Sequence, residues 1–160
     1  MKFLKELLPY ILIIIVVILI RTFLFSPALV SGSSMENTLY DGELVIVNKI
    51  GLKSGIERFD IVIVKIGNEL LIKRVIGLPN EKIEYRDNIL YINDEVMETP
   101  IEFEKTLDFT HMIGDNEYFV MGDNRDVSQD SRVLGAFSIE NIKGKVDLVL
   151  FPFNKIGFVK

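Results

Sequence analysis

Two short segments carry side chains that could act together as a nucleophile and a base. Residues 31–35 read SGSSM and follow an apolar N-terminal run, whereas residues 70–77 read LLIKRVIG. A serine hydroxyl needs a base before it attacks a carbonyl carbon, and a lysine among apolar neighbours can lose its proton near neutral pH. The chain has a single histidine, His111, and no cysteine. The chemistry that these segments favour is that of a serine–lysine pair.

Lys73 is the residue of the second segment that could serve as the base. The alternation of a strand places Lys73 on the same face as Leu71 and Val75, so its neighbours on that face are apolar. Burial disfavours the ammonium form, and moving a lysine pKa from about 10.4 to near 7 costs on the order of 4 to 5 kcal/mol. Considered alone, Lys73 and Arg74 are more simply explained as charges on an edge strand that prevent aggregation.

Three serines in the first segment, Ser31, Ser33 and Ser34, could each supply the hydroxyl. Gly32 lies among them, and a glycine permits the close approach of a ligand to the backbone. A short polar loop after an apolar run is also typical of an ordinary linker. The local sequence therefore does not choose among the three serines.

A third segment, at residues 121–132, reads MGDNRDVSQDSR and follows an apolar run. One interpretation is a solvated turn with an ion pair between Asp130 and Arg132. The other is a platform of polar side chains that orients the base.

Composition and charge exclude several classes of function. The net charge is −5, and because residues 1–25 carry +2, residues 26–160 carry −7. Proteins that bind nucleic acid neutralise phosphates with Lys and Arg, so an acidic body argues against that function. The absence of cysteine excludes disulfides, thiolate metal sites and cysteine nucleophiles.

The N-terminal residues include an apolar run long enough to cross a membrane. Residues 7–20 are interrupted only by Pro9 and Tyr10, and the apolar character resumes after Arg21 as far as Phe25. At about 1.5 Å per residue, a helix over residues 7–25 reaches roughly 28 Å, close to the ~30 Å thickness of the hydrocarbon layer. The run therefore predicts a single-pass anchor.

A cleaved signal peptide is the alternative for this run, because Lys2 and Lys5 resemble its charged beginning. No A-x-A cleavage site follows, and the bulky Leu29 and Val30 occupy the zone where cleavage would fall. A retained anchor fits better. The slight positive bias before the run places residues 1–6 in the cytoplasm and the acidic body outside the cell membrane.

After Pro27 the sequence reads almost entirely as β-strands bounded by Gly, Asp or Asn. Uninterrupted apolar runs are typical of strands covered on both faces, as in a closed barrel or packed sheets. A short helix is expected only at 138–141, where Ser138 is a candidate N-cap. Strands are predicted at 44–47, 61–66, 70–76, 83–85, 89–92, 117–121 and 145–151, with tight turns at 67–68 and 86–88.

The predicted fold is mainly β, with coiled antiparallel sheets that form a barrel-like domain after one N-terminal transmembrane helix. Residues 81–115 are more charged than the segments around them. We therefore expect a core made of residues 26–80 and 116–160, with residues 81–115 as a small inserted β subdomain.

Three motifs, which follow the apolar N-terminal run in this order, resemble those of bacterial type I signal peptidases of the single-anchor form found in Gram-positive bacteria. They are SGSSMENTL at 31–39, IKRVIGLP at 72–79, and GDNR at 122–125 with Ser128, Asp130, Ser131 and Arg132. Each motif is moderately specific alone, whereas the ordered set is very specific. The resemblance implies the signal peptidase fold and the removal of signal peptides from exported precursor proteins.

The resemblance also implies a role for individual residues. Ser34, immediately before Met35, would be the nucleophile and Lys73 the general base. Ser128 matches a serine that hydrogen-bonds the lysine amine, and Asp130 and Arg132 match residues that support the site. No metal or organic cofactor is implied. Precursors in this family carry small residues at the first and third positions before the cut, and we expect Met35 and Leu71 to line the pockets that read them.

The chain departs from the family pattern at three places. Gly32 stands where some members have a serine that helps to bind the oxyanion, although others also have glycine. The backbone N–H of Ser34 is then the main candidate for an oxyanion donor. Asn37 replaces the usual proline, and Asn80 with Glu81 replaces the usual Gly-Asp. These changes affect loops and leave the serine–lysine pair intact.

Two other functions are compatible with the same features. The first is a specialised relative with a narrow set of substrates, and the second is a catalytically silent, membrane-anchored domain that binds a partner. A third reading, a Ser-His-Asp triad, would use His111 with Asp108 or Asp115, but His111 lies in the predicted insert, far along the chain from either motif. We therefore expect a structural role for His111.

Overall fold

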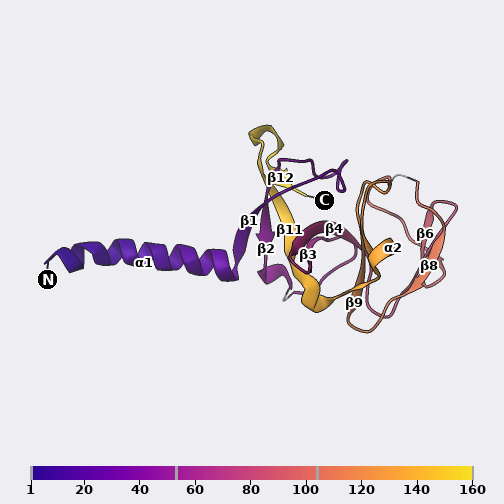
Figure 1. Cartoon of the computed structure of the whole chain (residues 1–160), viewed down its shortest axis with the longest axis horizontal. Coiled ribbons are helices and arrows are strands. Elements are labelled where there is room, and N and C mark those ends of the chain that lie inside the picture. Colours follow the sequence, from indigo (N-terminus) through magenta and orange to yellow (C-terminus); the bar gives the residue numbers. More distant parts are fainter. Residues whose placement is uncertain (1, 53, 104, 160) are drawn as a thin grey trace.

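The computed structural model describes residues 2–52, 54–103 and 105–159, with side chains from Glu6 onward. A single long helix, α1 (Lys2–Phe23), projects from a body made almost entirely of β-strands (Figure 1). Met1, which belongs to the stretch predicted to lie in the cytoplasm, is outside the described residues. The mainly β fold with one N-terminal apolar helix is as the sequence predicts.

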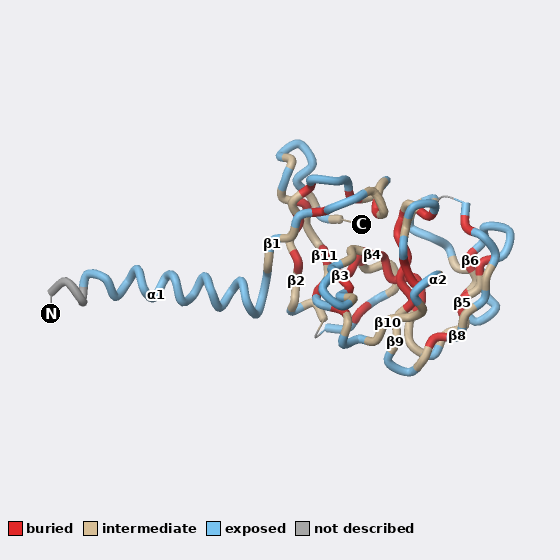
Figure 2. Tube along the Cα trace, in the orientation of Figure 1, coloured by how far each residue is buried: buried red, intermediate tan, exposed pale blue. Residues whose placement is uncertain are grey.

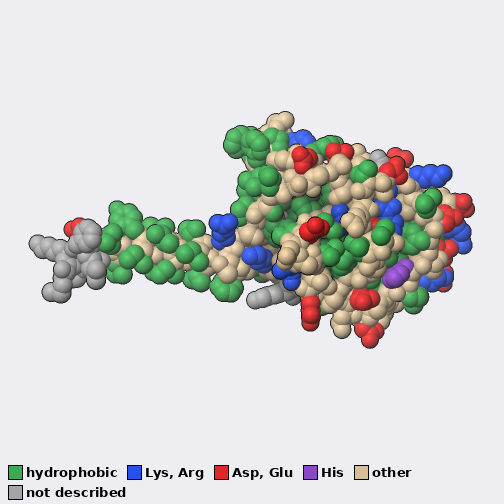
Figure 3. Space-filling view, in the orientation of Figure 1, with side chains coloured by type: hydrophobic (Ala, Val, Ile, Leu, Met, Phe, Trp, Pro, Cys, Tyr) green, Lys and Arg blue, Asp and Glu red, His purple; other side chains and the backbone are tan. Residues whose placement is uncertain are grey.

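The described side chains of α1 are exposed along its whole length (Figure 2). They are almost all hydrophobic (Figure 3), and the window Glu6–Phe23 has a mean hydropathy of 2.3. The helix is therefore long and apolar enough to cross a bilayer. It ends at Phe23, before the boundary at Phe25 that the apolar run suggests, because β1 (Phe25–Leu29) pairs with a strand of the body.

The junction between α1 and the body is short and hydrogen-bonded. Only Leu24 separates the end of α1 from the start of β1, and its carbonyl accepts the backbone N–H of Lys49 at 2.9 Å. The Lys49 ammonium donates to the carbonyls of Arg21 and Thr22, at 3.2 and 3.0 Å. These carbonyls belong to the last turn of the helix, where a cation is favoured.

The larger of two antiparallel sheets runs in the order β1-β2-β11-β3-β4-β9-β10, with β12 paired to β11. The uninterrupted apolar runs that predicted strands here correspond to their burial, since β3 and the second half of β4 are buried on both faces. Besides β1, its strands are β2 (Leu44–Asn48), β3 (Ile61–Ile66), β4 (Glu69–Gly77), β9 (Glu117–Met121), β10 (Phe137–Ser138), β11 (Ile142–Phe151) and β12 (Gly157–Phe158).

The smaller sheet has the order β7-β6-β5-β8 and lies on the side of the body away from α1 (Figure 1). Its central hairpin turns at Asp87 and Asn88, which have φ angles of 53° and 64°. Two positive φ angles in a two-residue turn match the right-handed twist of the flanking strands. The strands are β5 (Lys82–Arg86), β6 (Ile89–Ile92), β7 (Glu95–Val96) and β8 (Phe109–Met112).

Short helical turns occupy four places in the described residues. The expected turn after Ser138 is present as η2 (Ile139–Asn141), with the Ser138 hydroxyl accepting the N–H of Glu140. The sequence reading missed α2 (Ser131–Leu134), which begins at the N-cap Asp130. The other two turns are η1 (Ile50–Leu52) and η3 (Phe153–Lys155).

The hydrophobic core fixes the loop that follows β1. Met35 and Leu39 are buried with exposed fractions of 1% and 0%, and they pack in the same cluster as Val45, Ile63 and Val146. The SGSSM segment is therefore not a free linker. Its polar residues are held against the sheet by the two apolar side chains that follow them.

Candidate active site

Ser34 and Lys73 are joined by a hydrogen bond. The Lys73 amine lies 2.6 Å from the Ser34 hydroxyl oxygen, although the two residues are 39 positions apart in the sequence. Among the described residues, neither Ser31 nor Ser33 bonds to Lys73. The fold therefore selects Ser34 from the three serines that the local sequence left open.

Lys73 is in the interior of the sheet. It is 2% exposed, and β4 is paired on one side with β3 and on the other with β9. The alternative that Lys73 and Arg74 are edge-strand charges is therefore wrong. Burial lowers the pKa of Lys73 to about 8, although the nearby carboxylates of Asp130 and Asp123 act in the opposite direction. A lysine with this pKa is neutral in a useful fraction of molecules near neutral pH.

Arg74 points from the opposite face of β4 and is fully buried. Its Nε and Nη2 atoms donate to the two carboxylate oxygens of Asp123, at 2.9 and 2.8 Å. The Thr38 hydroxyl donates to Asp123 at 2.5 Å and accepts from Arg74 Nη2 at 3.1 Å. This group joins the Ser34 loop, the Lys73 strand and the polar loop after β9.

Asp123 and Thr38 belong to the sequence motifs, but the sequence predicted no role for them. A signal was present, because an arginine beside Lys73 on an apolar strand needs a buried carboxylate to compensate its charge. The sequence does not show which of the many acidic residues supplies it.

Gly122 is the point at which the Ser34 loop and the polar loop come into contact. A Cβ atom at this position would overlap the side chain of Ser128 and would come within 2.5 Å of the carbonyl oxygen of Ser34. The backbone N–H of Asn124 donates to that same carbonyl at 3.1 Å. Only a residue without a side chain allows this approach.

Asp130 and Arg132 form the ion pair that the sequence suggested, with Arg132 Nε 2.9 Å from an Asp130 oxygen. The other Asp130 oxygen accepts the backbone N–H of Gly122 at 3.0 Å. Burial raises the pKa of the Asp130 carboxyl, but the hydrogen bonds from Arg132 and Gly122 outweigh burial and lower it. The carboxylate is thus ionised near Lys73 and braces the loop.

Ser128 lies beside Gly122, but the hydrogen bond expected from it to the Lys73 amine is not formed. Its hydroxyl oxygen is buried and lies beside the Asp130 carboxylate, whose pKa it helps to lower. The Lys73 amine instead donates to Ser34, while the Ser128 side chain packs against the backbone of Gly122. An orienting role for Ser128 remains a prediction.

A small cleft of about 70 Å³ opens at Ser34 and Lys73. Both predicted substrate-binding residues, Met35 and Leu71, contribute to its wall. The cleft is narrow, so it suits small side chains. Its lining consists of residues 29–32, 34, 35 and 70–73.

The backbone next to Ser34 has one occupied and one free N–H group. Gly32 has a φ of +86° and donates its N–H to the Asp41 carboxylate at 2.8 Å, so this N–H is not directed at the cleft. The N–H of Ser34 makes no hydrogen bond to any residue that the structure describes. No group of three or more metal-binding side chains is found in the same residues.

His111 takes no part in this site. It lies in β8 of the smaller sheet, where its ring packs against Phe119 with centroids 5.1 Å apart.

Comparison with known proteins places this geometry in a family. A family model described as signal peptidase, peptidase S26, matches residues 3–151. Signal peptidase I of Bacillus amyloliquefaciens is 39% identical over 164 residues, which cover 94% of this chain and 89% of that protein. Signal peptidase IB of Staphylococcus aureus (strain MRSA252) is 32% identical over 180 residues, covering 96% and 94%.

A solved structure shows the same relationship in three dimensions. The crystal structure of a signal peptidase I from Enterococcus faecalis V583 has a TM-score of 0.51 and 32% sequence identity to this chain. The match covers 56% of this chain and 95% of the other.

Proposed function

Because the chain belongs to the signal peptidase family, peptidase S26, and is a serine peptidase that removes signal peptides, we propose that Ser34 is its nucleophile and Lys73 its general base. The observation that carries this assignment is the 2.6 Å hydrogen bond between the two side chains. It is supported by the burial that lowers the pKa of Lys73 to about 8.

In the proposed reaction, neutral Lys73 accepts the hydroxyl proton of Ser34 as the serine oxygen attacks the scissile carbonyl carbon. The free N–H of Ser34 donates to the oxyanion that forms. Collapse of this intermediate breaks the peptide bond, and the Lys73 ammonium returns its proton to the leaving amine. The acyl group stays on Ser34. A water that gives its proton to Lys73 then attacks the ester, and the Lys73 ammonium returns this proton to the Ser34 oxygen as the signal peptide is released.

The polar loop after β9 holds this pair in place. Asp130, Arg132 and Ser128 act by orientation, since Asp130 fixes the Gly122 backbone and Arg132 fixes Asp130. Met35 and Leu71 shape the narrow cleft that accepts the small side chains before the cut. The precursor would bind there as an extended strand.

In this proposal the precursor reaches the cleft from the membrane. We assign α1 as a single-pass anchor with its N-terminus in the cytoplasm and the β body outside, facing precursors that are themselves held in the bilayer. Residues 26–80 and 116–160 would form the catalytic core and 81–115 an inserted subdomain. Ser34 follows Leu29, the last residue of β1, by a few residues, so the cleft stays close to the anchor.

The test is cleavage of a precursor with an A-x-A site by the full chain in detergent. Ser34→Ala and Lys73→Met should each lose cleavage at that bond. Ser33→Ala is the matched control, because it removes a hydroxyl from the adjacent residue, and it should retain activity. An inactive Ser33→Ala protein with an active Ser34→Ala protein would refute the assignment. Retention of the native circular dichroism spectrum excludes misfolding as the cause.

A further inference from the structure

Arg125 is a buried cation that forms no ion pair with any carboxylate among the described residues. It is 2% exposed, and its three hydrogen bonds go to neutral acceptors, namely the Gly122 carbonyl and the hydroxyls of Tyr85 and Thr106, at 3.0, 2.9 and 2.8 Å. Its Nη2 atom is buried and has no partner in the part of the chain that the structure describes.

The surroundings of Arg125 compensate its charge only in part. Its guanidinium lies over the ring of Phe103, at 4.1 Å from the centroid, and over that of Tyr85, at 5.2 Å. Aromatic faces attract a cation but do not accept the in-plane N–H bonds of a guanidinium. By contrast, the other fully buried arginine, Arg74, has a bidentate carboxylate. Burial of an uncompensated charge is costly, so Arg125 is suited to receive an anion.

Arg125 lines a cavity of about 480 Å³ between β8 and the polar loop that follows β9. The same cavity is lined by Ser128, whose hydroxyl oxygen is buried beside the Asp130 carboxylate. Its rim includes the exposed carboxylates Asp108 and Asp126 and the exposed Lys105. The buried part of the cavity lining therefore carries the cation of Arg125, whereas the carboxylates of the lining are exposed to solvent.

We propose that this cavity binds a carboxylate side chain of the precursor, located a few residues after the scissile bond. The proposal rests on the function proposed above, and it adds a preference on the side of the mature protein. A carboxylate in this cavity would compensate the charge of the buried Arg125 guanidinium.

Two observations favour the precursor as the source of this carboxylate. The first is proximity, because Asn124, the neighbour of Arg125, is hydrogen-bonded to Ser34 itself, and Gly122 alone separates Ser34 from Ser128. Three residues of extended chain reach roughly 10 Å, so we expect the carboxylate within a few residues of the cut.

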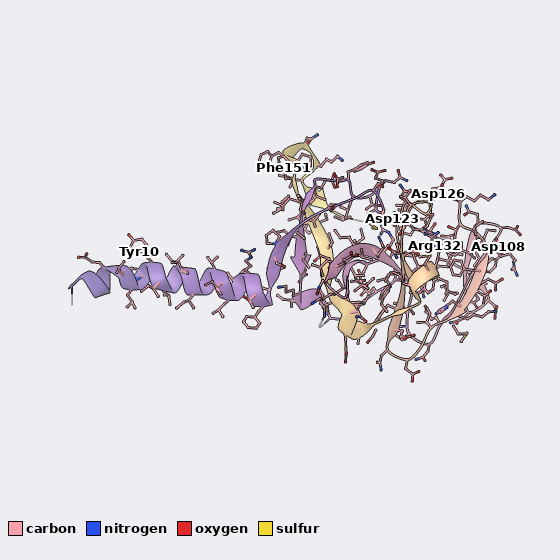
Figure 4. All side chains as sticks on the ribbon, viewed as in Figure 1. Tyr10, Asp108, Asp123, Asp126, Arg132 and Phe151 are labelled. Carbon is pink, nitrogen blue, oxygen red and sulfur yellow. The ribbon has the colours of Figure 1, made fainter. Side chains whose placement is uncertain are left out.

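The second observation is direction. The signal sequence of a membrane-held precursor must lie on the side of α1, so the mature part leaves on the other side. Figure 4 shows Asp126, Arg132 and Asp108, which line the cavity, on the side of the body away from α1. The long-range field of the chain, with a net charge of −5, opposes acidic segments. A preference for a carboxylate would therefore report local contacts at Arg125.

The experiment is a scan of the precursor. Asp, Asn and Lys are placed in turn at each of the first six positions after the cut, and kcat/KM is measured with the full chain in detergent. At one or two positions Asp should exceed Asn by roughly three- to tenfold, as expected for a charge-assisted hydrogen bond. Lys should be cut more slowly than Asn there. Equal rates for Asp and Asn at all six positions, with the Asn precursors cut normally, would overturn the inference.

Enzyme variants then assign the preference to Arg125. Arg125→Gln should reduce the Asp-to-Asn ratio to about one, whatever its absolute rate. Arg86→Gln is the matched control, because it removes the same charge from an exposed site in β5 of the smaller sheet, and it should keep the wild-type ratio. An unchanged ratio in Arg125→Gln would refute the assignment. If that variant does not fold, the scan with the wild-type chain still tests whether a carboxylate is preferred after the cut.

The outcomes also separate this inference from the proposed function and from a soluble ligand. Failure of the wild-type chain to cut any precursor would count against the proposed function, and the inference would fall with it. If acetate raises the melting temperature of the wild-type chain but not of Arg125→Gln while the precursor scan is flat, the cavity binds a free carboxylate and the precursor is excluded as its source.

Discussion

Asp123 accepts two hydrogen bonds from the guanidinium of Arg74, and both side chains are only 1% exposed. Their backbones belong to the loop after β9 and to the strand that carries Lys73. The ion pair therefore determines how far the base stands from the loop that braces it. It stabilises the site without touching the reacting atoms.

Removal of one partner of this ion pair should destabilise the fold strongly. Asp123→Asn leaves the Arg74 cation buried without a carboxylate, and we expect the free energy of unfolding to fall by about 3 kcal/mol. Asp126→Asn, an exposed position three residues away, is the control and should change it by less than about 0.5 kcal/mol. Urea unfolding followed by circular dichroism measures both. Equal stability of the two variants would show that the ion pair is not important.

Gly122→Ala should lower activity more than stability. The new methyl group overlaps Ser128 and approaches the carbonyl of Ser34, so the two loops must separate and the Ser34 hydroxyl moves away from Lys73. Misplacement of this kind by about 1 Å can reduce kcat on the order of a hundredfold. Gly157→Ala is the matched control, because a Cβ there has no neighbour closer than 4.0 Å. Precursor cleavage at saturating substrate should distinguish the two variants, and full activity in Gly122→Ala would contradict the close contact.

The pH dependence of kcat/KM should follow the neutral fraction of Lys73. Burial lowers the pKa of Lys73 to about 8, and only the neutral amine can accept the serine proton. We expect kcat/KM to rise roughly tenfold per pH unit below this value and to level off above it. The measurement uses a precursor without titrating side chains near the cut, between pH 6 and 9. A flat profile over that range would argue against Lys73 as the base.

Lys73→Met should be inactive yet more stable than the wild type at pH 7. The pKa of Lys73 is lower in the folded chain than in the unfolded chain, so below about pH 8 the fold carries a buried ammonium at a cost of roughly 3 kcal/mol. Between pH 8 and the ordinary lysine pKa, the unfolded chain binds the proton and the folded chain does not, so wild-type stability rises with pH. The variant should lack this rise.

Thermal unfolding of the wild type and Lys73→Met at pH 7 and pH 10 tests this linkage. We expect the free energy of unfolding of Lys73→Met to exceed that of the wild type by about 1 to 3 kcal/mol at pH 7 and by less at pH 10. A wild type that is the more stable protein at pH 7 would mean that the Lys73 amine does not pay a desolvation cost.

The sequence predicted most strands because their apolar residues alternate or run without interruption between turn residues. The β3–β4 hairpin is an example, since Gly67 and Asn68 connect two β-branched runs. It also predicted Lys73, whose apolar neighbours on one face indicated burial. The short helix α2 was missed because its four residues are too few for a periodic pattern, and Asp130 was predicted to form an ion pair and to support the site but not to be an N-cap.

The sequence predicted the motifs of the site but not how the fold brings them together. That β4 lies between β3 and β9, and is therefore central, depends on strand order, which no local pattern encodes. The partner of Arg74 is 49 positions away, and the approach of Ser34 to Gly122 joins loops that are far apart in the sequence. The hydrogen bond expected from Ser128 to Lys73 depends on the direction of one hydroxyl, which a motif does not specify.

The single residue between α1 and β1 has a consequence for where the enzyme can cut. Leu24 is hydrogen-bonded to Lys49, and the Lys49 ammonium donates to carbonyls of the last turn of the helix. These bonds hold the β body against the end of α1. With α1 in the bilayer, the distance between the cleft and the lipid surface would be fixed. The position of the cleft above the membrane would then determine how many precursor residues lie between the membrane and the cut.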